Sequence, residues 1–431
     1  MTRTVRIDHL ARVEGHGGVT VELDGNDVRS VRFDIFEGAR LLEGLVKGRT
    51  YQDVSSVLSR ICAICSVAHA VTSLKATESA FGVEVSPQTR VLRDLLFLGE
   101  SIESHALHLF LLALPDYLKY PSAIAMAADH REAVQLGLRL KKLGNAIQET
   151  VGGRAVHPVN AVPGGFGRAP DTEQLIELRR GLLQAVTDAE TTIGIFAGLP
   201  SAEFRRTDTA FAALRAPSEY GYYDGDEIEF LTSGETAAYP CSRYREFTNE
   251  RAVAHSHAKH SMHKGRPYMV GALARLSLNA GKLSGRATRA VHLLGLELPS
   301  CNPMDNNKAQ AVELVSDVER TLGIVESLLD ADIADETPVP VVPRAGTGTA
   351  VTEAPRGLLI HSYTYDEEGR IVTADVITPT ALNAASVEAH LRAAALGAAP
   401  DGDEALSRAM EMIVRAYDPC ISCSVHLIRR A

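Results

Sequence analysis

The sequence predicts a mainly α-helical protein of the α+β class, with a large helical bundle as its core and small β-sheets at its periphery. The first observation is the apolar run at 88–114, where hydrophobic side chains cover most of the circumference of a helix. The second is helical periodicity in further segments, at 131–151, 172–197, 269–295, 307–330 and 402–417. The third is the alternation of apolar and polar residues at 3–37 around a turn at 24–27, which predicts a β-hairpin.

The connecting segments follow from local signals. A short helix is expected at 40–49, because a glycine closes it at Gly48. Four ionisable residues in the long helix argue against a membrane span: Glu100, Glu103, His105 and His108. Residues 337–349 are rich in proline and glycine and are expected to form a connector. A second β-hairpin is expected after it, with its turn at 366–369.

Composition excludes several classes of function. The chain has 431 residues, of which 45% are hydrophobic, as in an ordinary globular protein with a large core. The net charge of -10 and the lack of a basic stripe argue against a nucleic-acid partner. We expect no signal peptide and no membrane span, because no stretch of about 18 uncharged apolar residues is present. Paired, reduced thiols favour a cytoplasmic location.

Two C-x-x-C pairs are the main chemical signal. They are Cys62 with Cys65 and Cys420 with Cys423, and they contain four of the six cysteines. Such pairs bring thiolates together on a soft or borderline metal: zinc, iron in clusters, copper(I) or nickel. A structural zinc site is the simplest interpretation, but it usually takes both pairs from one small module. Here the pairs stand near opposite ends of the chain, so the fold must bring its two ends together.

The residues around these pairs resemble those of one family. The first pair stands in RICAICSVAH and the second in DPCISCSVH. Both stretches resemble the large, catalytic subunit of [NiFe]-hydrogenases, and the EAPRGLL wording at 353–359 is most like the soluble, cytoplasmic group 3 type. The resemblance implies a hydrogenase large-subunit fold and an oxidoreductase that interconverts H2 with protons and electrons. It also implies one domain over 1–431: an N-terminal β-hairpin region at about 1–40, a helical core at about 50–330, and a β-hairpin and C-terminal metal-binding segment at about 350–431.

By resemblance, the cysteines hold a nickel–iron centre whose iron carries CO and CN- ligands. Cys62 and Cys420 would be the terminal nickel ligands, and Cys65 and Cys423 would bridge nickel and iron. Glu14, in the stretch RVEGHG, would take the proton from a nickel-bound cysteine, most naturally Cys420. A buried carboxylate beside a metal thiolate suits this role, because burial raises its pKa towards neutrality. Considered alone, a glutamate before a glycine is usually a solvated turn residue.

Further roles follow from the same resemblance. Arg356 would lie over the open side of the metal pair, where a permanently charged guanidinium can polarise H2. His69 would hydrogen-bond a bridging thiolate. Pro379 and Thr380 would contact the cyanide ligands. Without the resemblance, Arg356 would be interpreted as a surface ion-pair partner and His69 as a buried core histidine.

The resemblance also implies a Mg2+ site. Its ligands would be the carboxylate of Glu43, a backbone carbonyl near Val376 and the ring of His426, which suits a hard cation that keeps several waters. Considered alone, Glu43 would be a surface partner of Lys47. The chain continues from His426 to Ala431, whereas precursors in the family usually carry a longer tail that is cut after this histidine. Both a brief precursor extension and a form that matures without cleavage remain open.

The partners are H2, an iron–sulfur small subunit, diaphorase-type electron-transfer subunits and maturation proteins. A small subunit is required because the chain lacks further cysteine groups for an iron–sulfur relay. NAD(P) is the expected final acceptor. Three alternatives remain: an H2-sensing protein, a structural four-cysteine zinc protein, and a scaffold like the complex I subunit that has lost the cysteine pairs. Four histidines at 254–263 suggest another metal site, but no carboxylate or cysteine stands nearby in the sequence to complete it.

Overall fold

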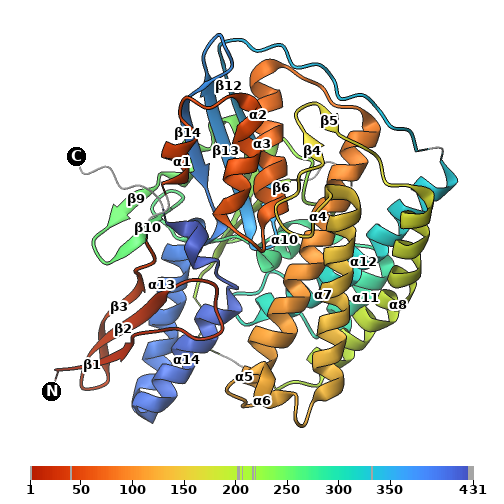
Figure 1. Ribbon diagram of the computed structural model, residues 1–431. Coiled ribbons are helices and arrows are strands. Elements are labelled where there is room, and N and C mark those ends of the chain that lie inside the picture. Colours follow the sequence, from red (N-terminus) through yellow and green to blue (C-terminus); the bar gives the residue numbers. More distant parts are fainter. Residues whose placement is uncertain are drawn as a thin grey trace.

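The N-terminal part of the chain forms a three-stranded antiparallel sheet beside the C-terminal helices (Figure 1). The computed structural model describes residues 2–38, 41–200, 204–205, 207–215, 218, 220–331 and 333–425. The sheet consists of β1 (Thr2–Ile7), β2 (Gly17–Asp24) and β3 (Asp27–Ile35), in the order β1-β2-β3. Its outer strands pack on the two helices α13 (Pro379–Ala398) and α14 (Asp403–Ala416). The two ends of the chain are therefore neighbours in space.

Five long helices form the body of the molecule. They are α3 (Ser66–Phe81), α4 (Pro87–Leu107), α7 (Arg131–Gly152), α8 (Thr172–Ala197) and α12 (Asp305–Asp330). Helix α4 packs between α7 and α12, and α8 covers α12 (Figure 1). The hydroxyl of Ser86 caps α4, and Pro87 opens it without loss of a needed hydrogen bond. A π-helical turn at His108–Ala113 and α5 (Leu114–Tyr117) extend it.

The segment Pro87–Tyr117 is long and apolar enough to cross a membrane by length and composition. However, 83% of its most apolar window is buried inside the molecule, as expected for the core helix of a globular protein. Its buried arginine, Arg93, is neutralised by Glu78 of α3 through two hydrogen bonds of 2.6 Å. The apolar run at 88–114 is thus confirmed as a core helix.

A second sheet covers one end of the body. Strands β12 (Gly346–Ala354), β13 (Gly357–Tyr365) and β14 (Ile371–Ile377) form an antiparallel sheet that packs on α3. A Cβ at Gly348 would overlap the carbonyl oxygen of Ala76, so strand and helix meet only because this residue is glycine. The turn between β12 and β13 holds Pro355 and Arg356, and the sheet thereby aims Arg356 inwards.

Smaller elements complete the fold. A four-stranded sheet has the order β11-β6-β7-β8, with β6 at Ala210–Arg215, β7 at Glu227–Thr232, β8 at Glu235–Pro240 and β11 at Tyr268–Met269. Two short hairpins pair β4 (Ala161–Val162) with β5 (Gly165–Phe166) and β9 (Arg251–Val253) with β10 (Ser256–His260). The short helices are α1 (Leu42–Leu45), α2 (Tyr51–Leu58), α6 (Ala123–Met126), α9 (Arg245–Thr248), α10 (Ala272–Asn279) and α11 (Gly285–Leu293).

The mainly helical α+β class with small sheets is confirmed, but three expected elements are wrong in detail. The single helix at 269–295 is two helices, because Ser284 ends one segment and its hydroxyl caps α11 through the N–H of Ala287. The connector at 337–349 ends early, since β12 begins at Gly346. The helix α13 is absent from the predicted elements, although Pro379 opens it.

Candidate metal centre

The four paired cysteines meet in the interior, where the two ends of the chain come together. The sulfur of Cys62 lies 3.4 Å from that of Cys420, and the sulfur of Cys65 lies 3.7 Å from that of Cys423. All four sulfurs lie within 4.8 Å of one another, and all four residues are buried. Sulfurs that share one metal at about 2.3 Å are separated by about 3.8 Å in a tetrahedral site, so the spacing fits a common metal centre.

The structure joins Cys420 and Cys423 in a disulfide, whereas Cys62 and Cys65 are free thiols. The disulfide must be reduced before all four sulfurs can serve as thiolate ligands. A hydrogen bond from the Cys65 thiol lowers the pKa of the Cys62 thiol, while burial raises the pKa of Cys65. Of the two free thiols, Cys62 therefore ionises first.

Local backbone geometry places each pair. Cys65 stands at the N-cap of α3, and its N–H donates to the sulfur of Cys62 over 3.2 Å. The N–H of Cys420 donates to the hydroxyl oxygen of Thr380, at the start of α13, over 2.9 Å. The N-terminus of α13 thus lies directly against the second pair, where its free N–H groups and its dipole favour a negative ligand.

Glu14 lies against the second cysteine pair. Its Oε2 is 3.2 Å from the sulfur of Cys420 and accepts the N–H of Ser422 over 3.0 Å. Its Oε1 accepts a short hydrogen bond from the Ser422 hydroxyl. The next residue, Gly15, has a φ of +86°, and a Cβ there would lie 2.7 Å from the nitrogen of Ser422. Glycine therefore allows the two segments to approach closely enough for the carboxylate to contact the sulfur.

Arg356 reaches the same centre from the turn between β12 and β13. Its Nε donates to the carbonyl oxygen of Asp418 over 2.7 Å, and its Nη2 donates to Asp418 Oδ1 over 2.9 Å. Although burial lowers it, the charges of Asp418 and of the cysteines raise the pKa of Arg356, so the guanidinium stays charged. Its Nη1 is buried, and no residue in the described part of the chain accepts a hydrogen bond from it. A donor left in this way beside the sulfurs indicates room for a further acceptor.

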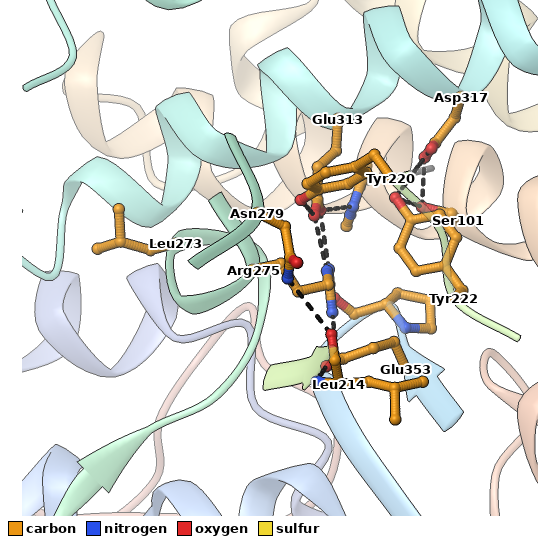
Figure 2. A network of polar contacts seen from close by, with 12 residues as sticks. Ser101, Leu214, Tyr220, Tyr222, Leu273, Arg275, Asn279, Glu313, Asp317 and Glu353 are labelled. Atoms are coloured by element: carbon orange, nitrogen blue, oxygen red, sulfur yellow. Dashed lines mark hydrogen bonds and ion pairs between the residues drawn. The ribbon is translucent and has the colours of Figure 1, made fainter. Parts of the chain in front are cut away.

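A buried polar network holds the strand end that precedes Arg356 (Figure 2). At its centre, Arg275 makes hydrogen bonds of 2.6 and 2.8 Å to Glu313 and of 2.9 Å to Glu353. The same guanidinium donates to the carbonyl oxygens of Ala354 and Pro355 over 3.0 and 2.8 Å. Arg275 thus fixes the backbone that leads into the Arg356 turn.

Glu43 and Val376 meet, as the predicted Mg2+ site requires. The N–H of Val376 donates to Glu43 Oε1 over 2.7 Å. Burial raises the pKa of Glu43 to about 7, so the site favours a compensating cation. The contact uses the N–H of Val376, while the prediction named a carbonyl near it. His426 lies outside the described residues, and the Mg2+ site stays a prediction.

His69 is buried on α3, and its Nδ1 lies 3.1 Å from Nε2 of His361. With Nδ1 engaged in this way, Nε2 is the atom that would face a bridging thiolate, and that contact stays a prediction. Pro379 and Thr380 are buried in the first turn of α13, beside Cys420. The hydroxyl oxygen of Thr380 accepts the N–H of Cys420, which leaves its O–H free to donate towards a cyanide ligand.

Three residues of the site were missed by the sequence prediction. Asp418 holds Arg356, Ser422 holds Glu14, and Glu100 of α4 accepts the N–H groups of Val67 and Ala68 at the start of α3. Asp418 and Ser422 stand inside the DPCISC stretch, so their place beside the cysteines was a usable signal. Glu100 gave no such signal, because its partner lies on another helix.

The comparisons agree with this geometry. A family model described as nickel-dependent hydrogenase matches residues 40–151 and 194–426, and a second model, described as HoxL-like, matches residues 4–37. The alpha subunit of sulfhydrogenase 1 from Pyrococcus furiosus is 41% identical and is matched over 99% of this chain and 98% of the relative. A subunit of the vhu F420-non-reducing hydrogenase from Methanocaldococcus jannaschii is 32% identical over 90% of this chain and 98% of its own length. A solved NAD+-reducing [NiFe]-hydrogenase in its H2-reduced state superposes with a TM-score of 0.89, at 28% identity, over 98% of this chain and 99% of that one.

Proposed function

Because this chain belongs to the nickel-dependent hydrogenase family, we propose that it splits H2 reversibly and heterolytically at a nickel–iron centre held by its paired cysteines. The observation that carries the proposal is the meeting of four sulfurs with Glu14 on one side and Arg356 on the other. A structural zinc site needs neither a carboxylate beside a sulfur nor a buried guanidinium with a free donor.

The residues present fit the metal pair and its diatomic ligands. Cys62 and Cys420 would bind nickel terminally, and Cys65 and Cys423 would bridge to iron. The buried Nη1 of Arg356, without an acceptor among the described residues, and the N-terminus of α13 offer donors for CO and CN-. When bound, the centre supplies the electron-accepting site at which H2 is polarised.

Proton handling falls to Cys420 and Glu14. As a thiolate, Cys420 accepts the proton released from H2, and the Glu14 carboxylate lies 3.2 Å from its sulfur to receive it. Glu14 is only half-buried, whereas Cys420 is buried, so this step moves the proton outwards. The two hydrogen bonds from Ser422 fix the carboxylate in position.

Metal analysis and infrared spectroscopy test the assignment. We expect about one nickel and at least one iron per chain in the matured complex, with CO and CN- stretching bands. The Cys62→Ser variant should lose nickel, because a serine hydroxyl does not ionise to replace a thiolate. The matched control is Cys241→Ser, since Cys241 is a free buried thiol outside the cluster. Zinc alone, with no such bands, would instead support the structural site.

Arg356→Lys tests the guanidinium. Lysine keeps the charge but has no planar fork, so it cannot bind Asp418 and a ligand at the open position together. We expect the rate of H2 oxidation to fall by about 10²–10³-fold, the loss typical of one preorganised donor. Nickel and iron contents should stay at the wild-type level. An unchanged rate would show that Arg356 only fixes the turn.

The finer assignments are supported less directly. Electrons would leave through an iron–sulfur small subunit, and from there through diaphorase-type subunits to NAD(P), in the cytoplasm. Similarity to the solved NAD+-reducing hydrogenase and to sulfhydrogenase alpha subunits supports this route. The contact between Glu43 and Val376 and the raised pKa of Glu43 support a Mg2+ site completed by His426.

A further inference from the structure

Two histidines and a carboxylate meet away from the cysteines. His255 lies in the turn between β9 and β10, His260 ends β10, and Glu388 lies in α13. The three residues place one ligand atom each within 4.8 Å of the others. The sequence shows only a run of histidines, and helix α13 supplies the carboxylate that the run lacks. Two imidazoles and one carboxylate form a donor set that binds zinc in proteins.

The distances within this cluster suit a shared ion. His260 Nδ1 lies 3.9 Å from Glu388 Oε2, which is too far for a direct hydrogen bond. Two atoms that each lie about 2.1 Å from one ion are separated by roughly 3.0–4.2 Å, depending on the angle at the ion. His255 Nε2 lies closer, 2.6 Å from Glu388 Oε1, and would have to withdraw slightly to admit the ion.

A simple ion pair explains only part of this arrangement. His255 and Glu388 alone would form a half-buried pair, and Glu388 also accepts the N–H of Phe33 over 3.0 Å. His260 has no place in that pair, although its side chain is only 3% exposed. Its Nε2 is buried without a hydrogen-bond partner in the described part of the chain. Burial also lowers its pKa, so the imidazole is neutral, as a metal ligand must be.

We propose that His255, His260 and Glu388 bind a divalent ion of the zinc class, with water in the remaining position. The ion would fasten the β9–β10 hairpin to α13. Within that hairpin, Ala258 pairs with Val425, two residues beyond Cys423. The ion would thus stabilise the strand against which the C-terminal cysteine segment rests. This proposal does not depend on the reaction at the cysteine centre.

Cobalt(II) and zinc(II) are the probes, used on the matured hydrogenase complex after treatment with a chelator. Wild-type protein should bind one additional ion beyond its nickel and iron. Bound cobalt should show visible d–d bands without a thiolate-to-metal charge-transfer band, since no sulfur is a ligand. Saturating zinc should raise the Tm of the complex, because an ion that binds only the folded state stabilises it.

Variants decide between this site and adventitious binding. Glu388→Gln and His260→Gln should weaken the additional binding by at least about tenfold and abolish the rise in Tm with zinc. His257→Gln is the matched control, because His257 lies in the same strand but bonds the carbonyl oxygen of Glu37. If Glu388→Gln fails to fold, His255→Gln decides, since its side chain is 24% exposed. No additional ion in the wild type, or equal binding in all variants, would overturn the proposal.

Discussion

The Glu14→Gln variant is expected to keep its nickel and iron but to lose H2/D+ exchange by about 10²–10⁴-fold, the usual contribution of one positioned proton-transfer group. The amide keeps the shape of the side chain and can still accept from Ser422. It cannot take a proton from Cys420, whose sulfur lies 3.2 Å from the carboxylate. Exchange in D2O measures this step directly, because it requires the proton to leave the site but needs no external electron acceptor.

Two comparisons make this result specific. Glu37→Gln removes a carboxylate from the same end of the molecule, but this one contacts His16, so exchange should be unchanged. Ser422→Ala keeps the acid and removes one hydrogen bond that positions it, so exchange should fall much less than in Glu14→Gln. Loss of metal in Glu14→Gln would show that the residue supports the centre structurally. Wild-type exchange with full metal content would place the proton route elsewhere.

The cysteine pairs could be predicted from sequence because their chemistry is local. Two thiolates three residues apart converge on one metal wherever they lie, and flanking residues such as Glu14 and Arg356 were named only through the resemblance. The joining of the two chain ends followed from the same reasoning, and the contact of Cys62 with Cys420 confirms it. The long core helix was equally predictable, because its apolar residues cover all of its sides.

Helix α13 was harder to predict because its sequence carries little periodicity. The stretch is rich in alanine and buried on most sides, so polar residues do not mark an exposed face. Its charged residue Glu388 looks like a surface residue until β10 and β3 are placed against it. Contacts of this kind join segments far apart in the chain, and no spacing rule anticipates them. The same holds for Glu100, which accepts N–H groups of α3.

The buried network around Arg275 has the largest expected effect on stability. Although burial raises it, the charge and hydrogen bonds of Arg275 lower the pKa of Glu313 to about 2, so Glu313 is an anion in the interior. Burial raises the pKa of Asp317 to about 8, so this neighbour is neutral at pH 7 and Tyr222 bonds it. Arg275 is therefore the cation on which the buried Glu313 charge depends (Figure 2).

The Arg275→Met variant should accordingly lower the free energy of unfolding by about 3–5 kcal/mol, the cost of leaving a buried charge without its partner. The midpoint of thermal unfolding of the complex, followed by circular dichroism, measures the loss as a shift of several degrees. Arg286→Met is the control, since Arg286 pairs with Glu190 on the surface and should contribute at most about 1 kcal/mol.

A double variant separates charge from packing in the same network. In Arg275→Met combined with Glu313→Gln, no unpaired charge remains, so stability should recover partly from the Arg275→Met value. If the double variant is as unstable as the sum of the two single variants, packing around Arg275 dominates. Arg275 also holds the carbonyl oxygens of Ala354 and Pro355, so the Arg356 turn should loosen in both variants. H2 oxidation should then stay low even where stability recovers, because the guanidinium of Arg356 would no longer be held over the cysteines.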